Sequence, residues 1–125
     1  MGIIDVLEVY AQNWRDFIPS DKTGGQILQF DPDSKKKVSD AIVRVWVKAE
    51  NKEQKDAKKG ATPISKTFYL TEINCTESMH RIISTSSYLQ DGRIVQSTNE
   101  PDATWHYIVP ESIASHLKKA VCDSK

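Results

Sequence analysis

The chain has 125 residues, of which 38% are hydrophobic and 27% are charged, with 17 basic and 17 acidic side chains. This length predicts a single domain over residues 1–125. The formal net charge is zero, which argues against a nucleic-acid binder with a broad basic face, because neutralising phosphates requires a surplus of Lys and Arg. No apolar stretch approaches the roughly 18–20 residues of a transmembrane helix, so we expect a small soluble domain.

The first ten residues lack the features of a signal peptide. Asp5 and Glu8 interrupt their apolar part, and no basic residue precedes Arg15. A signal peptide instead begins with basic residues and continues as an unbroken apolar stretch. This start is compatible with a cytoplasmic protein, and also with an exported protein whose signal has been replaced by an initiator Met.

Short alternating or β-branched segments are separated by turn residues about every eight to twelve positions, which is the pattern of an antiparallel meander. We expect six strands, which lie near Tyr10–Ile18, Gln26–Asp31, Ala41–Ala49, Ser65–Asn74, Met79–Gln90 and Arg93–Ser97. Val43, Val45 and Val47 alternate with polar or aromatic residues in the third strand. The valine face should therefore be the core face.

Turn and loop signals lie between these strands. A turn is expected at residues 20–25, which end in two glycines, and a polar connection at residues 33–40. Glu50–Pro63 mixes basic and acidic residues without apolar periodicity, which predicts a solvated hairpin loop. Asp91 and Gly92 predict a two-residue hairpin turn in which both residues favour positive φ.

A helix is expected at the carboxy end. Pro110 should open it, because the missing N–H of proline costs nothing in the first helical turn. One apolar stripe follows at Ile113, Leu117, Ala120 and Val121. The predicted fold class is α+β, with a single antiparallel meander sheet of about six strands and a C-terminal α-helix packed on it.

The two cysteines fall at the ends of elements that this architecture brings together. Cys75 follows the fourth strand, and Cys122 ends the helix. A disulfide between them would contribute about 4 kcal/mol on the chain-entropy model. Two reduced, buried thiols in a cytoplasmic protein are equally compatible with these residues. No Cys-x-x-Cys occurs, so neither a redox motif nor a zinc knuckle is indicated.

A series of short motifs runs through nearly the whole chain. Its members are Trp14, Phe30–Ser34, Val43–Val47, Ile73–Cys75, Arg81, Tyr88, Val95–Ser97, Trp105–Ser112 and Val121–Cys122. In this order the motifs resemble those of the bacterial surface-adhesin protein E family, over residues 14–122. The resemblance implies an exported domain, in the periplasm or at the cell surface, with a mostly antiparallel sheet, a carboxy-terminal helix and a Cys75–Cys122 disulfide.

The resemblance also bears on function. Named members of the family are surface proteins that bind host matrix components and can dimerise, so it implies a protein partner and the ability to form a homodimer. Many other members are short exported proteins of unknown role. We therefore expect a noncatalytic exported domain that acts by protein–protein binding.

The three histidines are the candidate ligands for a metal ion or haem. No two of His80, His106 and His116 have the His-x-His or His-x3-His spacing, so we expect no metal site and no cofactor. The alternative function is binding of a small hydrophobic molecule such as haem, with Met79 or His80 as an axial ligand.

The sequence does not indicate a catalytic site. Ser84, Ser86, Ser87 and Ser97 do not stand in a Gly-x-Ser-x-Gly motif. Asp31 and Asp33 are paired carboxylates that suit acid–base chemistry, but they flank Pro32 and are more simply interpreted as turn formers. We expect that the chain is not an enzyme.

The strand face opposite the valines is the candidate interaction surface. It carries Arg44, Trp46 and Lys48, and Trp and Arg are favoured anchors of protein interfaces. The alternative is that the helix or the amino-terminal segment covers this face, with Trp46 as ordinary core. The basic run Lys35–Lys37 is a candidate for binding acidic glycans, and its alternative is a solvated turn.

Overall fold

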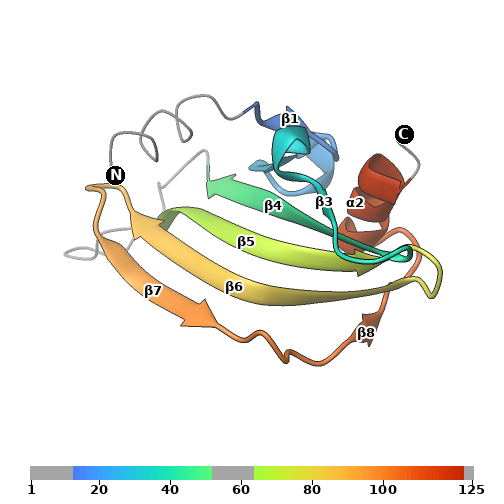
Figure 1. Cartoon of the computed structure of the whole chain (residues 1–125). Coiled ribbons are helices and arrows are strands. Elements are labelled where there is room, and N and C mark those ends of the chain that lie inside the picture. The colour runs from blue at the N-terminus through green and yellow to red at the C-terminus, as the bar shows by residue number, and fades with distance from the viewer. Residues whose placement is uncertain (1–12, 52–63, 123–125) are drawn as a thin grey trace.

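The computed structural model describes residues 13–51 and 64–122, which form an antiparallel sheet with a helix packed on one face (Figure 1). Three parts of the sequence-based expectations lie outside the described residues. They are the start of the chain, residues 10–12 of the first expected strand and residues 52–63 of the charged loop.

Three long strands form the centre of the sheet. They are β4 (Ile42–Asn51), β5 (Ile64–Asn74) and β6 (Met79–Leu89), paired in that order. Alternating β-branched and aromatic side chains favour this conformation. The register sets Val45 opposite Thr71, and Ile73 opposite His80. The predicted strands at these three places are confirmed.

Shorter strands line both edges of this centre. On one side β2 (Gln26–Phe30) and β3 (Lys36–Lys37) pair with successive parts of β4, and β1 (Arg15–Asp16) pairs with β2. On the other side β7 (Ile94–Asn99) and β8 (His106–Tyr107) pair with successive parts of β6.

The edges differ in detail from the prediction. Two-residue strands leave no periodic signal, so β3 and β8 were not predicted and the described sheet has eight strands rather than about six. In its described part the first strand covers only Arg15–Asp16 and does not reach Ile18. Ile18 instead joins Leu28 and Ala49 in a small buried cluster.

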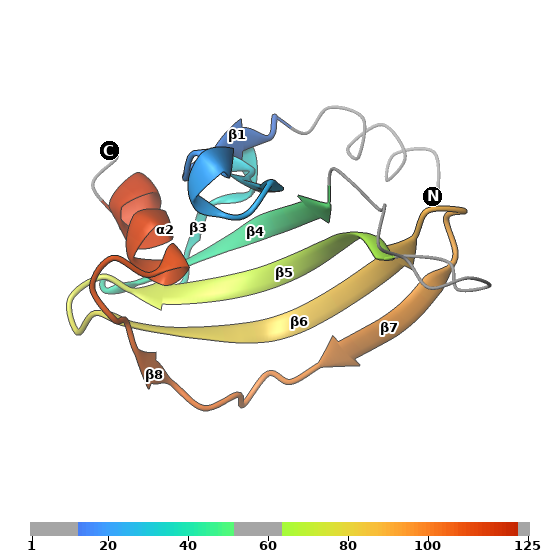
Figure 2. The ribbon, with the colours of Figure 1, turned by 180° about the vertical axis from the view of Figure 1, so that it is seen from behind.

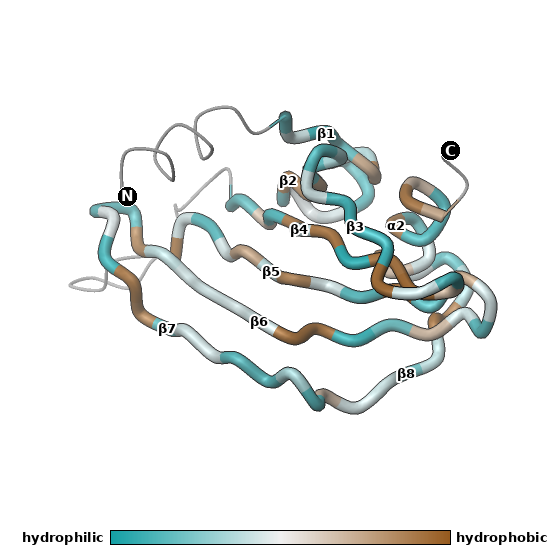
Figure 3. The backbone as a smooth tube through the Cα atoms, viewed as in Figure 1, coloured by the Kyte–Doolittle hydropathy of each residue, from teal (hydrophilic) through white to brown (hydrophobic). Residues whose placement is uncertain are grey.

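The main core lies between the sheet and helix α2 (Ile113–Cys122). Leu117 and Val121 of the helix pack with Val45, Val47 and Ile73 of the sheet. Both views of the ribbon show α2 against the end of the sheet where β5 ends (Figures 1 and 2), and hydropathic colouring marks apolar segments on β4 and α2 (Figure 3). The valine face is therefore the core face, as predicted.

The helix begins later than predicted. Pro110 lies in a turn that precedes the helix, and Glu111 has a φ of 67°, which an α-helix does not allow. Ser112 caps the helix, because its Oγ accepts a hydrogen bond from the backbone N–H of Ser115 at 3.2 Å. The prediction that Pro110 opens the helix is wrong, because the left-handed backbone conformation of Glu111 separates Pro110 from the helix, which begins at Ile113.

The hairpin between β6 and β7 also has a different turn. Gly92 has a φ of 92°, but Asp91 does not have a positive φ. The N–H of Gly92 donates to the carbonyl of Leu89 at 2.9 Å, and the N–H of Leu89 donates to the carbonyl of Arg93 at 2.8 Å. The loop therefore contains three residues that end in a left-handed glycine, rather than the predicted two.

Candidate functional site

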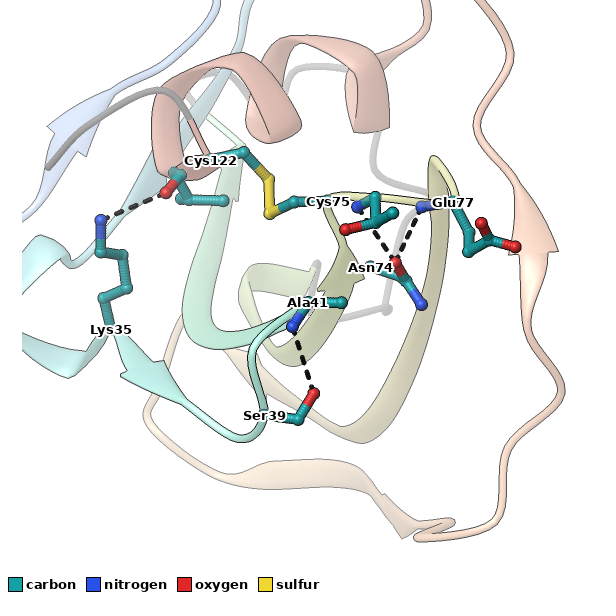
Figure 4. Close-up of a disulfide and its surroundings, with 9 residues drawn as sticks. Lys35, Ser39, Ala41, Asn74, Cys75, Glu77 and Cys122 are labelled. Atoms are coloured by element: carbon teal, nitrogen blue, oxygen red, sulfur yellow. Dashed lines mark hydrogen bonds between the residues drawn. A yellow bond between two sulfur atoms is a disulfide. The ribbon is translucent and has the colours of Figure 1, made fainter.

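A disulfide fixes the end of α2 to the sheet. Cys75 and Cys122 are bonded, with their Cα atoms 5.8 Å apart (Figure 4). The Nζ of Lys35 donates to the carbonyl oxygen of Val121 at 3.1 Å and so satisfies one of the last carbonyls of the helix. The disulfide implied by the resemblance is present, and the alternative of two reduced thiols is wrong.

The candidate interaction surface lies on the other side of the sheet. Neighbouring residues in a strand point to opposite faces, so Arg44, Trp46 and Lys48 point away from the valine face on which α2 packs. Arg44 is 37% exposed and Lys48 is 14% exposed, and Trp46 is half-buried. The expected alternative that the helix covers this face is wrong, because α2 lies on the opposite one.

A buried carboxylate holds one end of this surface together. Glu72 is 2% exposed and stands between Arg44 on β4 and Arg81 on β6. Its two oxygens accept hydrogen bonds at 2.7 Å from Arg44 and at 2.9 Å from Arg81. Burial acts to raise the pKa of Glu72, but the hydrogen bonds and charges of the two arginines outweigh it and leave the pKa below its usual value.

Aromatic rings stack on the cations at both ends of the surface. The guanidinium of Arg81 lies 4.5 Å from the ring centre of Trp105. The ammonium of Lys48 lies 4.8 Å from the ring centre of Trp14, and Trp14 in turn contacts Phe68. Such contacts favour a cation near the ring face. We use the name "cationic face" for Arg44, Trp46, Lys48, Glu72 and Arg81.

The amino-terminal segment covers part of the cationic face. Trp14 lies beside Lys48 and Phe68. The sequence left open that either the helix or the amino-terminal segment covers this face, and the amino-terminal segment does so in part. Trp46 nevertheless keeps partial exposure among the described residues. Its backbone N–H donates to the Oγ of Ser34 at 3.0 Å, so the neighbouring turn fixes this part of β4.

Two of the three histidines come together. His80 on β6 pairs with His106 on β8, and their ring centres are 6.2 Å apart. Burial, and after it the charge of His106, lowers the pKa of His80. His116 lies apart on α2, where it borders a hollow with Lys22 and Lys119. Sequence spacing could not show the pair, because only the β6–β8 register brings the two rings together.

A mostly apolar pocket opens between α2 and the sheet. Its volume is about 280 Å³, and its lining includes Phe17, Tyr69, His80, Ile82 and Leu117. Ile82 and Ile113 border it and remain 38% and 50% exposed. The pocket is slightly smaller than the 300–1,000 Å³ or so that is typical of drug-sized ligands.

Asp31, Asp33 and Ser87, which the sequence offered as candidates for catalysis, have structural roles. The Oδ1 of Asp31 accepts from the N–H of Asp33 at 3.0 Å, which caps a short 3-10 helix, η2 (Pro32–Ser34). The hydroxyls of Ser87 and Thr67 are hydrogen-bonded at 2.9 Å. Of the basic run, Lys36 and Lys37 form β3, so the expected polar connection contains a short strand.

The described residues show no group of three or more His, Cys, Asp and Glu side chains that could hold a metal ion. In the same part of the chain, no helix is long and apolar enough to cross a membrane.

Comparison with known families gives one match. The family model described as surface-adhesin protein E matches residues 14–123. No curated protein and no solved structure is significantly similar to the chain.

Proposed function

The chain belongs to the surface-adhesin protein E family, and from this membership and the geometry above we propose that it is a noncatalytic exported domain that binds an acidic protein through the cationic face. The proposal is supported by one observation in particular. Arg44, Lys48 and Arg81 place three positive charges on the sheet face away from α2. The two arginines share Glu72, and Lys48 lies 3.7 Å from Glu50, so one positive charge remains in surplus among these five residues.

The chemistry of this face suits a protein partner. The guanidinium of Arg44, which stays 37% exposed beside Glu72, and the half-buried ring of Trp46 are the kind of side chains that become anchors when a partner excludes water from them. The surplus positive charge steers an acidic partner toward the face, and this steering should weaken at high salt. The disulfide and the family support placement outside the cytoplasm, at the cell surface or in the periplasm.

A binding assay with matched variants tests this proposal. Purified host matrix glycoproteins, chosen to include acidic ones, are immobilised and exposed to the wild type, Trp46→Ala and a double variant K118A/K119A on the opposite side of the molecule. We expect saturable binding that Trp46→Ala weakens at least about tenfold, whereas the helix variant binds like the wild type. No saturable binding to any protein of the panel, or equal binding by all three forms, would contradict the proposal.

The pocket between α2 and the sheet favours a second candidate function, which is binding of a small hydrophobic molecule. Its apolar walls and the few polar groups of Tyr69, Thr71 and His80 are the usual composition of such sites. Its volume of about 280 Å³ suits a ligand smaller than haem.

The second candidate has its own test. Ala114 lines the pocket, so Ala114→Phe should fill it and abolish binding of the neutral fluorescent probe N-phenyl-1-naphthylamine. A wild-type protein that does not bind the probe would remove this candidate. A hemin titration without a shifted Soret band would remove the haem form of it.

The expected homodimer stays a prediction. The exposed edge strand β7 suits the pairing of two copies, since its six residues, Ile94–Asn99, carry no charge and such edges tend to pair with another strand.

A further inference from the structure

The histidine pair lies at a fixed place in the sheet. The N–H of Ile108 donates to the carbonyl of Ser78 at 2.9 Å, and this bond sets the register in which His80 stands opposite His106. The two rings come from different strands, are tilted by 48° and have their centres 6.2 Å apart. His106 is exposed, so solvent can reach the space between the rings.

We propose that His80 and His106 together bind a divalent transition-metal ion of the Cu²⁺, Ni²⁺ and Zn²⁺ class, with water in the remaining coordination positions. Imidazole suits these ions. A metal ion lies about 2.0–2.1 Å from a histidine nitrogen, and hence roughly 3.2 Å from the ring centre. Two rings with centres 6.2 Å apart can therefore both reach one ion. If the ring centres move about 1 Å closer, the angle between the two rings at the metal ion becomes tetrahedral.

The surroundings favour the neutral, metal-binding form of His80. A histidine must lose its proton before it binds a metal ion, and burial together with the charge of His106 lowers the pKa of His80. Glu100 lines the same hollow as both rings and adds a negative charge. Arg81 lines it as well, but its guanidinium is paired with Glu72. On its other side, His80 lines the pocket between α2 and the sheet, to which Tyr69 of β5 also contributes.

The ion would join two strands that otherwise share little pairing. β8 has two residues, and both pair with the start of β6. Trp105 directly precedes His106 and stacks on Arg81 of the cationic face. Metal binding should therefore hold Trp105 in place. The inference goes beyond the proposed function, because it requires no protein partner.

Calorimetric titration of the tag-free protein with CuCl2 and NiCl2 near neutral pH tests the site. We expect one ion per chain. His106→Gln should weaken binding at least about tenfold, since it removes one of two protein ligands, and His116→Gln should leave it unchanged. His106 is exposed, so its replacement should not prevent folding. Acidification should also weaken binding, because protons compete with the metal ion for the histidine nitrogens.

A second measurement identifies the ligands directly. Cu²⁺ should broaden the NMR signals of the His80 and His106 rings before that of His116. The proposal is overturned if the wild type shows no binding up to about 1 mM metal, if His106→Gln binds as tightly as the wild type, or if the His116 signal broadens first.

Discussion

Glu72 is the residue on which the cationic face depends. Its carboxylate joins Arg44 on one neighbouring strand to Arg81 on the other, and the Nη1 of Arg81 also donates to the carbonyl of Ala103 at 3.0 Å. Losing the carboxylate would leave two arginines, 37% and 20% exposed, without their shared partner. A single buried side chain therefore orders groups from three parts of the chain.

Replacing Glu72 with Gln should lower the free energy of unfolding by about 1–3 kcal/mol, because two charge-assisted hydrogen bonds weaken while both arginines stay partly hydrated. Urea denaturation measures the change. Glu77→Gln is the matched control, since Glu77 is exposed in the turn between β5 and β6 and its replacement should cost less than about 0.5 kcal/mol. Equal losses for both variants would show that the ion pairs contribute little.

Acid should reveal the same interaction. The pKa of Glu72 is lowered from 4.5, because the two arginines outweigh the effect of burial. The folded state therefore holds the proton less tightly than the unfolded state, and the stabilisation is complete above pH 4.5 and is lost as the pH falls through the folded pKa. The wild type should lose stability more steeply than Glu72→Gln below pH 4.5 in acid denaturation curves. Parallel curves would contradict this assignment.

The sequence could locate only part of these sites. Alternation in β4 predicted that Arg44, Trp46 and Lys48 share a face, and the structure agrees. It could not show that Glu72 lies between two arginines, because cross-strand register depends on the lengths of the turns. The one available signal was Glu72 itself, which is the only charged residue between positions 67 and 73 of β5. The His80–His106 pair left no comparable signal.

Apolar packing, a helix cap and a disulfide hold helix α2 on the sheet. Leu117 and Val121 are 4% and 1% exposed, and burial of such side chains contributes about 1.5–3 kcal/mol each. Ser112 caps the amino end of the helix, and the Cys75–Cys122 disulfide fixes the carboxy end. A helix of ten residues is too short to be stable alone in water.

The double variant C75S/C122S should lower the free energy of unfolding by about 4 kcal/mol, because the cross-link between residues 47 positions apart restricts the unfolded chain. Urea denaturation of the oxidised wild type and the variant gives the difference. Trypsin should also cleave after Lys118 and Lys119 faster in the variant. Unchanged stability would mean that packing alone holds the helix.

Ser112→Ala should lower the stability by about 1 kcal/mol, the usual cost of losing a helix cap. Ser112→Asp keeps an oxygen acceptor at the same place and should retain most of the stability. Thermal unfolding followed by circular dichroism compares the three forms. A loss as large in Ser112→Asp as in Ser112→Ala would contradict the role of the cap.

Element boundaries were predicted where a pattern is long and failed where the backbone turns sharply. The ten- and eleven-residue strands β4, β5 and β6 carry enough alternation to be recognised. The start of α2 and the β6–β7 turn depend on single backbone angles, at Glu111 and Asp91, which residue type does not determine.

At the scale of the molecule, the described residues form a sheet with α2 on one face and the cationic face, partly covered by Trp14, on the other. The zero formal net charge therefore hides a local surplus of positive charge, which suits a surface domain that binds through a patch rather than over its whole surface. The modest apolar content is sufficient because the disulfide adds to a small core.

The most direct test of this account counts free thiols in protein isolated from the compartment where the cell places it, unfolded without reductant. The account requires a disulfide that holds α2 on the valine face of the sheet, in a chain that has left the reducing cytoplasm. It predicts no free thiol before reduction and two after it, one each from Cys75 and Cys122. Two free thiols before reduction would contradict both the bonded helix and the export of the chain.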